Sequence, residues 1–230
     1  MLTGGTQTLS GVVAPEAIDA NTDSGGTTIN GGTSINDYSG GTTINAGTLA
    51  VSADANLGAA AGGLSFGGGT LRFDAGFTSN RGVTLLASGG TFNTNGNDAT
   101  LGGTITGAGG LTKSGGTLML TGTNDYQGDT TISGGTLGVS TDVNLGAATG
   151  ILSVRGGGTL QFIADNFTSD RNVTIGPGNA IFDTNGHDAT LGGAITGGSA
   201  STELHKIGAG TLTLGGTTPI PVSCKLLPGR

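Results

Sequence analysis

The 230-residue sequence predicts an all-β fold, a single-stranded parallel β-helix (solenoid) of roughly ten coils, and three observations favour this class. Fifty residues are glycine, about 22% against a usual share of about 7%, and each glycine in a helix interior costs about 1 kcal/mol relative to alanine. Hydrophobic residues make up 34% of the chain and charged residues 10%, which disfavours charge-driven disorder. The third observation is an internal repeat in which apolar side chains alternate as in a strand.

Two long copies of one segment cover most of the chain. Asn-Leu-Gly at 56–58 returns at 144–146, and FNTNGNDATLGGTIT at 92–106 returns as FDTNGHDATLGGAIT at 182–196. Three of the five prolines lie near the C-terminus, and proline cannot donate to a strand ladder. We therefore predict four regions, namely N-terminal coils at 1–36, a first long repeat at 37–124, a second at 125–216 and an irregular tail at 217–230.

A shorter repeat lies inside each copy. The tripeptide Gly-Thr-Leu recurs at intervals of 19 to 26 residues between Gly47 and Gly158 if Gly90-Thr91-Phe92 is counted as a variant. Apolar side chains alternate after each glycine, as at Leu118 and Leu120, so one side of each strand should be buried. Further strands are predicted at 42–45, 64–66, 83–85, 130–133 and 173–175. Coils of about 22 residues, stacked about 4.8 Å apart, would form a rod about 45 to 50 Å long.

Charge and composition exclude several classes of function. The formal net charge is −7 with only eight Lys and Arg, so we expect no nucleic-acid partner. The single cysteine, Cys224, cannot form an internal disulfide, and no apolar run is long enough to span a membrane. The first twenty residues do not read as a signal peptide, so we expect any export signal to lie outside this chain.

The segment 111–140, LTKSGGTLMLTGTNDYQGDTTISGGTLGVS, resembles the autotransporter-associated β-strand repeat of bacterial passenger domains. A partial copy runs from Asp37 to Ser52, and a last one begins at His205. The resemblance implies a right-handed parallel β-helix that reaches the cell surface through an outer-membrane β-barrel of the same polypeptide, a part we expect outside this chain. It also implies adhesion or self-association, with host or neighbouring-cell surface proteins, glycans or the protein itself as partners, and no cofactor.

The alternative is a β-helix enzyme that acts on carbohydrates, because such enzymes gather acidic and basic side chains on one groove. The candidate groups are Asp74, Arg81 and Asp98 in the first copy and Asp165, Arg171 and Asp188 in the second. Arg81 and Asp98 recur as Arg171 and Asp188, so the repeat itself accounts for them. The unduplicated groups Glu16, Glu203, His187 and His205 are dispersed and form no acid/base pair. We therefore expect no catalytic residue.

Three other motifs have simpler explanations. Ser24 in Asp-Ser-Gly-Gly resembles a protease nucleophile turn, but no His base lies near it in the sequence. The Asn-Gly segments 93–98 and 183–188 resemble a calcium loop only faintly and are typical of turns, which leaves calcium an open alternative and no metal predicted. Tyr38 and Tyr126 occupy the same link in both copies. They could present exposed rings to a partner, although packing at a corner is favoured.

Overall fold

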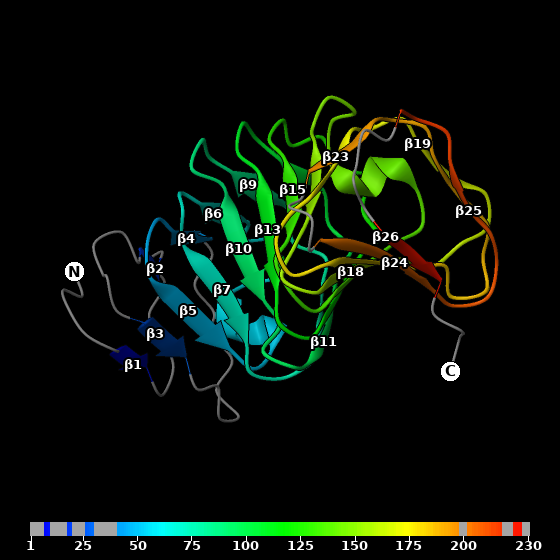
Figure 1. The fold of residues 1–230 in the computed structure, drawn as a ribbon. Helices are drawn as coiled ribbons and strands as arrows, with labels where there is room; N and C mark the ends of the chain where they lie inside the picture. Colours follow the sequence, from blue (N-terminus) through cyan, green and yellow to red (C-terminus); the bar gives the residue numbers. More distant parts are fainter. Residues whose placement is uncertain are drawn as a thin grey trace.

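The chain folds into stacked parallel strands. The computed structural model describes residues 41–197 and 202–217, together with the backbone of the strands at 7–9, 18–19, 26–29 and 223–226. These strands form a solenoid of about eight turns with almost no helix (Figure 1). The predicted all-β parallel solenoid is therefore confirmed. The predicted ten coils are slightly more than the turns observed, because the prediction divided all 230 residues into coils of about 22 residues.

The solenoid has three faces, and the chain passes along face 1, face 2 and face 3 in turn. Face 1 begins with the sheet β2 (Ile18–Asp19), β4 (Thr42–Ile44), β6 (Leu64–Phe66), β9 (Val83–Leu85) and β12 (Ile105–Thr106). Face 2 is the sheet β1 (Gln7–Leu9), β3 (Gly26–Ile29), β5 (Thr48–Val51), β7 (Thr70–Phe73), β10 (Gly90–Asn93), β13 (Leu111–Ser114), β15 (Thr130–Ile132), β17 (Leu152–Val154), β20 (Val173–Ile175) and β23 (Ile195–Gly197). Face 3 is the sheet β8 (Thr78–Ser79), β11 (Asp98–Leu101), β14 (Thr117–Leu120), β16 (Thr136–Val139), β18 (Gly158–Phe162), β21 (Ala180–Asp183), β24 (Glu203–Ile207) and β26 (Ser223–Leu226).

A second sheet continues face 1 further along the stack. It consists of β19 (Phe167–Ser169), β22 (Ala189–Leu191) and β25 (Leu212–Leu214). Two one-turn 3₁₀ helices, η1 (Asp54–Leu57) and η2 (Asp142–Leu145), interrupt the strands. The strands predicted at 42–45, 64–66, 83–85, 130–133 and 173–175 are present as β4, β6, β9, β15 and β20, within one residue at each end.

Equivalent side chains lie directly above one another. On face 2 one inward column consists of Leu49, Leu71, Phe92, Lys113, Ile132, Val154 and Ile175, each without exposed surface. The neighbouring outward column consists of Thr48, Thr70, Thr91, Thr112, Thr131, Ser153, Thr174 and Thr196. Full burial stabilises each large apolar side chain by about 1.5–3 kcal/mol. The core is therefore one continuous stack, apolar in this column except at Lys113, and the hydroxyl columns face outward.

The second long repeat is turned by one face relative to the first. The strand β4 lies on face 1, whereas its counterpart β15 lies on face 2. In the same way β5 and β7 lie on face 2, whereas their counterparts β16 and β18 lie on face 3. The short helices move as well, because η1 comes between strands of faces 2 and 1 and η2 between strands of faces 3 and 2. Figure 1 shows them on different sides of the solenoid, η1 in cyan and η2 in light green. One long repeat thus makes four full turns and then advances by one face, so the second copy begins one face further around the solenoid.

The segment 217–230, predicted to be an irregular tail, contains the four-residue strand β26. Strand β26 pairs in parallel with β24 and ends the face 3 sheet. Pro219, Pro221 and Pro228 lie outside β26, so none of them removes a hydrogen-bond donor from the strand.

Candidate functional site

A bend of sequence Asp-x-Asn-Leu-Gly interrupts the strands once in each copy. In η2 the Asn144 Oδ1 accepts the backbone N–H groups of Ser140 and Thr141, each at 2.9 Å. Leu145 points into the core with 1% exposure. Gly146 has a φ of 79°, in the region that favours glycine. Asn144 therefore folds the bend, Leu145 anchors it in the core, and Gly146 allows the chain to leave it.

The first copy repeats this arrangement. Asn56 Oδ1 accepts the backbone N–H groups of Ser52 and Ala53 at 3.0 and 2.9 Å, Leu57 is fully buried and Gly58 has a φ of 78°. The agreement between two positions on different faces shows that the structure of the bend does not depend on the face that it occupies.

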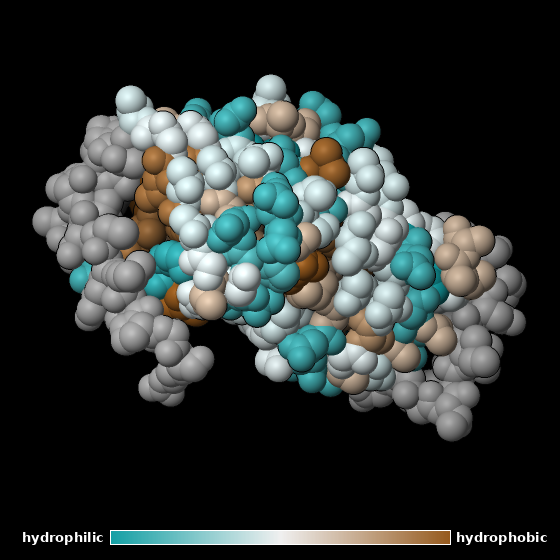
Figure 2. Space-filling view, turned by 90° about the vertical axis from the view of Figure 1, so that its right-hand side faces the viewer, coloured by the Kyte–Doolittle hydropathy of each residue, from teal (hydrophilic) through white to brown (hydrophobic). Residues whose placement is uncertain are grey.

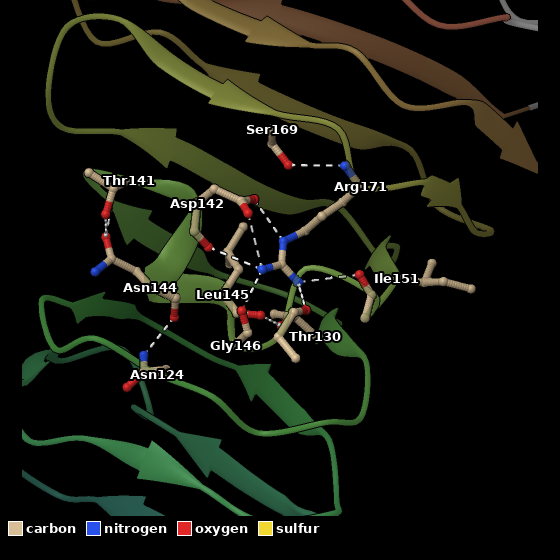
Figure 3. Close-up of polar contacts among 12 residues, drawn as sticks. Asn124, Thr130, Thr141, Asp142, Asn144, Leu145, Gly146, Ile151, Ser169 and Arg171 are labelled. Atoms are coloured by element: carbon tan, nitrogen blue, oxygen red, sulfur yellow. Dashed lines mark hydrogen bonds and ion pairs between the residues drawn. The ribbon is translucent and has the colours of Figure 1, made fainter.

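A buried arginine from the next coil holds each bend, and we call this arrangement the arginine clamp (Figure 3). Arg171 follows β19, and its side chain is 2% exposed. Its Nε lies 2.7 Å from Asp142 Oδ1, and its Nη groups donate to the carbonyl oxygens of Gly146, Ala147 and Gly150. A guanidinium presents five donors in a planar fork, so it can satisfy a carboxylate and several carbonyls together. Burial of this charge is tolerated because it is paired and hydrogen-bonded.

Arg81 forms the same clamp in the first copy, where it follows β8. Its Nε lies 2.9 Å from Asp54 Oδ1, and its Nη groups donate to the carbonyl oxygens of Leu57, Gly58, Ala59 and Gly62. The clamp therefore joins two successive coils at the places where a bend replaces a strand.

The alternative function, a carbohydrate-active enzyme, would need Arg81 and Arg171 to face a groove, but both guanidinium groups are already paired within the fold. Arg81 and Arg171 pair with Asp54 and Asp142, not with Asp98 and Asp188. A hollow of about 230 Å³ adjoins Asp142 and Arg171, but the Arg171 guanidinium is committed to the bend. Sequence reasoning missed the clamp, although Asp54 recurs as Asp142 at the same shift as the Asn-Leu-Gly motif that follows it.

The other proposed groove residues form separate contacts. Asp74 accepts hydrogen bonds from Arg72, and Asp188 Oδ1 accepts the backbone N–H of Thr211 at 2.6 Å. The expectation that the unduplicated groups form no acid/base pair is wrong, because Asp165 lies 2.9 Å from His187 Nδ1 and Glu203 Oε2 lies 2.5 Å from His205 Nε2. Within 41–197 and 202–217, no group of three His, Cys, Asp or Glu side chains could hold a metal ion. Ser24 and Glu16 lie outside the described residues.

The Asn-Gly segments form turns. Asn93 Oδ1 accepts the backbone N–H of Asn95 at 2.9 Å, and Asp183 Oδ1 accepts that of Asn185 at the same distance. Asn95 and Asn185 have φ of 50° and 48°, a left-handed conformation that asparagine tolerates. The oxygens proposed as calcium ligands are thus used, in part, to shape the turns.

Tyr126 is buried, so its ring packs inside the solenoid, the alternative that the sequence favoured over presentation to a partner. It has no exposed surface, and its hydroxyl lies 2.5 Å from Thr130 Oγ1. Burial raises the pKa of the hydroxyl to about 12. The ring lies over Gly146, where any Cβ would come within 2.8 Å of it, so Tyr126 packs against the clamped bend. Tyr38 lies outside the described residues.

Two lysines lie above phenylalanines in the inward columns. Lys113 pairs in register with Phe92 on face 2, and Lys206 pairs with Phe182 on face 3. Lys113 Nζ donates to the carbonyl oxygens of Ser114 and Gly116 at 2.9 Å, and also to that of Gly115. Burial lowers the pKa of Lys113 to about 8. The lysine therefore satisfies carbonyls at a corner of the coil from inside the core.

The family comparison matches the parts of the chain that contain these features. The passenger-associated-transport-repeat model matches residues 34–51, 111–139 and 204–218. The chain carries the repeat of autotransporter passenger domains. The central match contains both the core lysine Lys113 and the buried Tyr126. Comparison with the curated proteins and with the solved structures gave no match.

The matched passenger repeats imply a secreted or cell-surface protein. No helix in the described part of the chain is long and apolar enough to cross a membrane. The contacts that join successive coils include the two arginine clamps, and Lys113 instead binds carbonyl oxygens of its own coil.

Proposed function

We propose that this passenger segment is a non-enzymatic, surface-exposed stalk that mediates adhesion or self-association. The observation that carries the proposal is the uninterrupted stack of inward columns, in which each coil is paired with the coils above and below it. The arginine clamps join successive coils, and the buried Lys113 binds carbonyl oxygens at a corner of its own coil, so these polar groups are used within the fold. Such a rod can hold its far end at a distance from its base and expose a long side surface for binding.

The exterior supports a role in contact rather than catalysis. Hydroxyl columns run along the outside of face 2 and face 1, where Thr43, Ser65, Thr84 and Thr106 are in register. Figure 2 shows mostly pale and hydrophilic residues on one side, with hydrophobic residues in a few separate areas. Among the described residues the exposed large apolar side chains are Leu86, Val143 and Ile151. We infer that binding is spread over many weak polar contacts to host or neighbouring-cell proteins, glycans or a second copy.

The ends of the stack favour a second copy as one partner. β23, β25 and β26 each end a sheet, so one edge of each has no strand partner among the described residues. Unpaired edges are templates for the strand of another chain. We expect concentration-dependent association of the full chain, measured by light scattering, and a monomer at all concentrations would contradict association through the ends.

Bead binding tests the adhesive role directly. Polystyrene beads coated with the full chain should aggregate and should attach to cell or glycan surfaces, whereas albumin-coated beads should not. Attachment should survive the paired change Asp98→Ala with Asp188→Ala, which removes two acidic groups of the enzyme alternative. Cleavage of acidic polysaccharides by the unmodified chain, lost in this variant, would instead support an enzyme. Beads that neither aggregate nor attach would contradict the proposal.

A further inference from the structure

We propose that Asn95-Gly96 is a site of spontaneous covalent modification, in which Asn95 deamidates through a cyclic succinimide. In this reaction the Gly96 backbone nitrogen loses its proton and bonds to Asn95 Cγ, and the side-chain nitrogen leaves as ammonia. Water then opens the ring to aspartate or isoaspartate. The sequence places Asn-Gly at 30–31, 95–96 and 185–186, and the structure distinguishes the last two sites, which lie within the described residues.

The turns are nearly identical in backbone conformation. Asn95 and Gly96 have φ of 50° and 85°, and Asn185 and Gly186 have φ of 48° and 89°. All four residues are exposed, so water can reach both sites. A difference in reactivity between them therefore depends on their hydrogen bonds.

The attacking nitrogen is held in one turn and not in the other. Gly186 N–H donates to Ala209 O at 2.9 Å. Gly96 N–H makes no backbone hydrogen bond within the described residues. The carbonyl that corresponds to Ala209, three residues after the core lysine, is that of Gly116, and it accepts Thr136 N at 2.8 Å and Lys113 Nζ at 2.9 Å. Because Lys113 and Thr136 of the next coil both donate to the Gly116 carbonyl, the Gly96 N–H has no backbone acceptor among the described residues.

The product would change the corner chemically. Asn95 Nδ2 donates to Asp74 Oδ1 at 3.3 Å, and Arg72 also binds Asp74. An aspartate at position 95 would replace this donor by a second carboxylate beside Asp74, and like charges at this distance repel. An isoaspartate would also lengthen the backbone between β10 and β11. Modification at Asn95 is therefore expected to loosen the contact between its coil and the preceding coil, which contains Asp74.

Peptide mapping by mass spectrometry tests the proposal on the full chain kept at pH 8.5 and 37 °C. We expect a gain of about 1 Da at Asn95 about two- to tenfold faster than at Asn185, the factor that one hydrogen bond supplies. In urea the two rates should become equal, because the difference lies in the fold. Asn95→Gln should remove the first modification and leave the rate at Asn185 unchanged. Equal rates in the folded chain, faster change at Asn185, or no change at either site would overturn the proposal.

Discussion

The two long repeats have the same local structure and face different directions. Both contain an arginine clamp on the aspartate of the bend, yet the bend held by Arg81 lies on face 3 and the bend held by Arg171 lies on face 1. The inward columns continue across this change, because Leu118 and Leu120 of the first copy stack on Leu137 and Val139 of the second, which have a different place in the repeat. The unit that packs is therefore the single strand. The long repeat need not return to the same face.

The largest expected effect is the loss of a clamp. Arg171→Met leaves Asp142 and three carbonyl oxygens without the guanidinium, and removal of one partner of a buried pair costs about 3–5 kcal/mol. Arg81→Met should cost a similar amount, because its contacts are equivalent. Urea unfolding of both variants measures the two losses. A loss below 1 kcal/mol in either variant would show that the clamp does not join the coils.

The core lysine should make stability depend on pH. The pKa of Lys113 is lowered from 10.5 to about 8, so between these values the unfolded chain binds more protons than the folded chain. Stability should therefore rise by up to about 3 kcal/mol as pH increases from 7 to 10. The variant Lys113→Met should not show this rise. Parallel pH profiles for the two proteins, obtained from urea midpoints, would refute the assignment.

Removal of the Tyr126 hydroxyl should have a smaller effect. Tyr126→Phe loses the hydrogen bond to Thr130 Oγ1 and should cost about 1 kcal/mol at neutral pH. The pKa of Tyr126 is raised from 10.0 to about 12, so the wild-type chain should lose stability above pH 10 as the unfolded tyrosine ionises. Thermal unfolding of both proteins at pH 7 and pH 11 tests both statements. The contribution of Lys113 is common to the two, so we expect the stability of the wild type relative to the variant to fall between these pH values.

The smallest effect is expected at an exposed ion pair. Arg72 and Asp74 are in contact at 2.8 Å, with side-chain exposures of 37% and 28%. Arg72→Met should change the free energy of unfolding by less than about 1 kcal/mol, because solvent screens exposed pairs. This variant is the matched control for the clamps. A loss as large as that of Arg171→Met would remove the distinction between buried and exposed arginines.

Much of the fold could be predicted from the sequence, because alternation and turn residues act locally. Leu118 and Leu120 are buried as their alternation predicts, and the Asn-Gly segments are turns. The strands at Asp98–Leu101 and Ala189–Leu191 were not predicted, since they follow these turns at once and carry only one large apolar residue each. The part that could be predicted is thus the part with strong local periodicity.

The rotation of the second copy also had a signal in the sequence. The strands that follow Gly47, Gly69 and Gly90 lie on face 2, and those that follow Gly116 and Gly135 lie on face 3. The interval from Gly90 to Gly116 is the longest of the series, at 26 residues, and it contains the change of face. The spacing alone could not show this, because an insertion in a loop has the same effect on the sequence. The arginine clamps were missed for a similar reason, since Asp54 and Arg81 lie 27 residues apart.

Disulfide trapping tests the central claim, that the repeats share one stack and differ by one face. In a Cys224→Ser background, Thr112→Cys with Thr131→Cys places two cysteines in register on face 2, within reach of a disulfide. The matched pair is Thr106→Cys with Thr131→Cys, which would be adjacent only if β15 lay on the face of its counterpart β4. We predict rapid oxidation of the first pair and none of the second. Oxidation of the second pair without the first would contradict this structure of the stack.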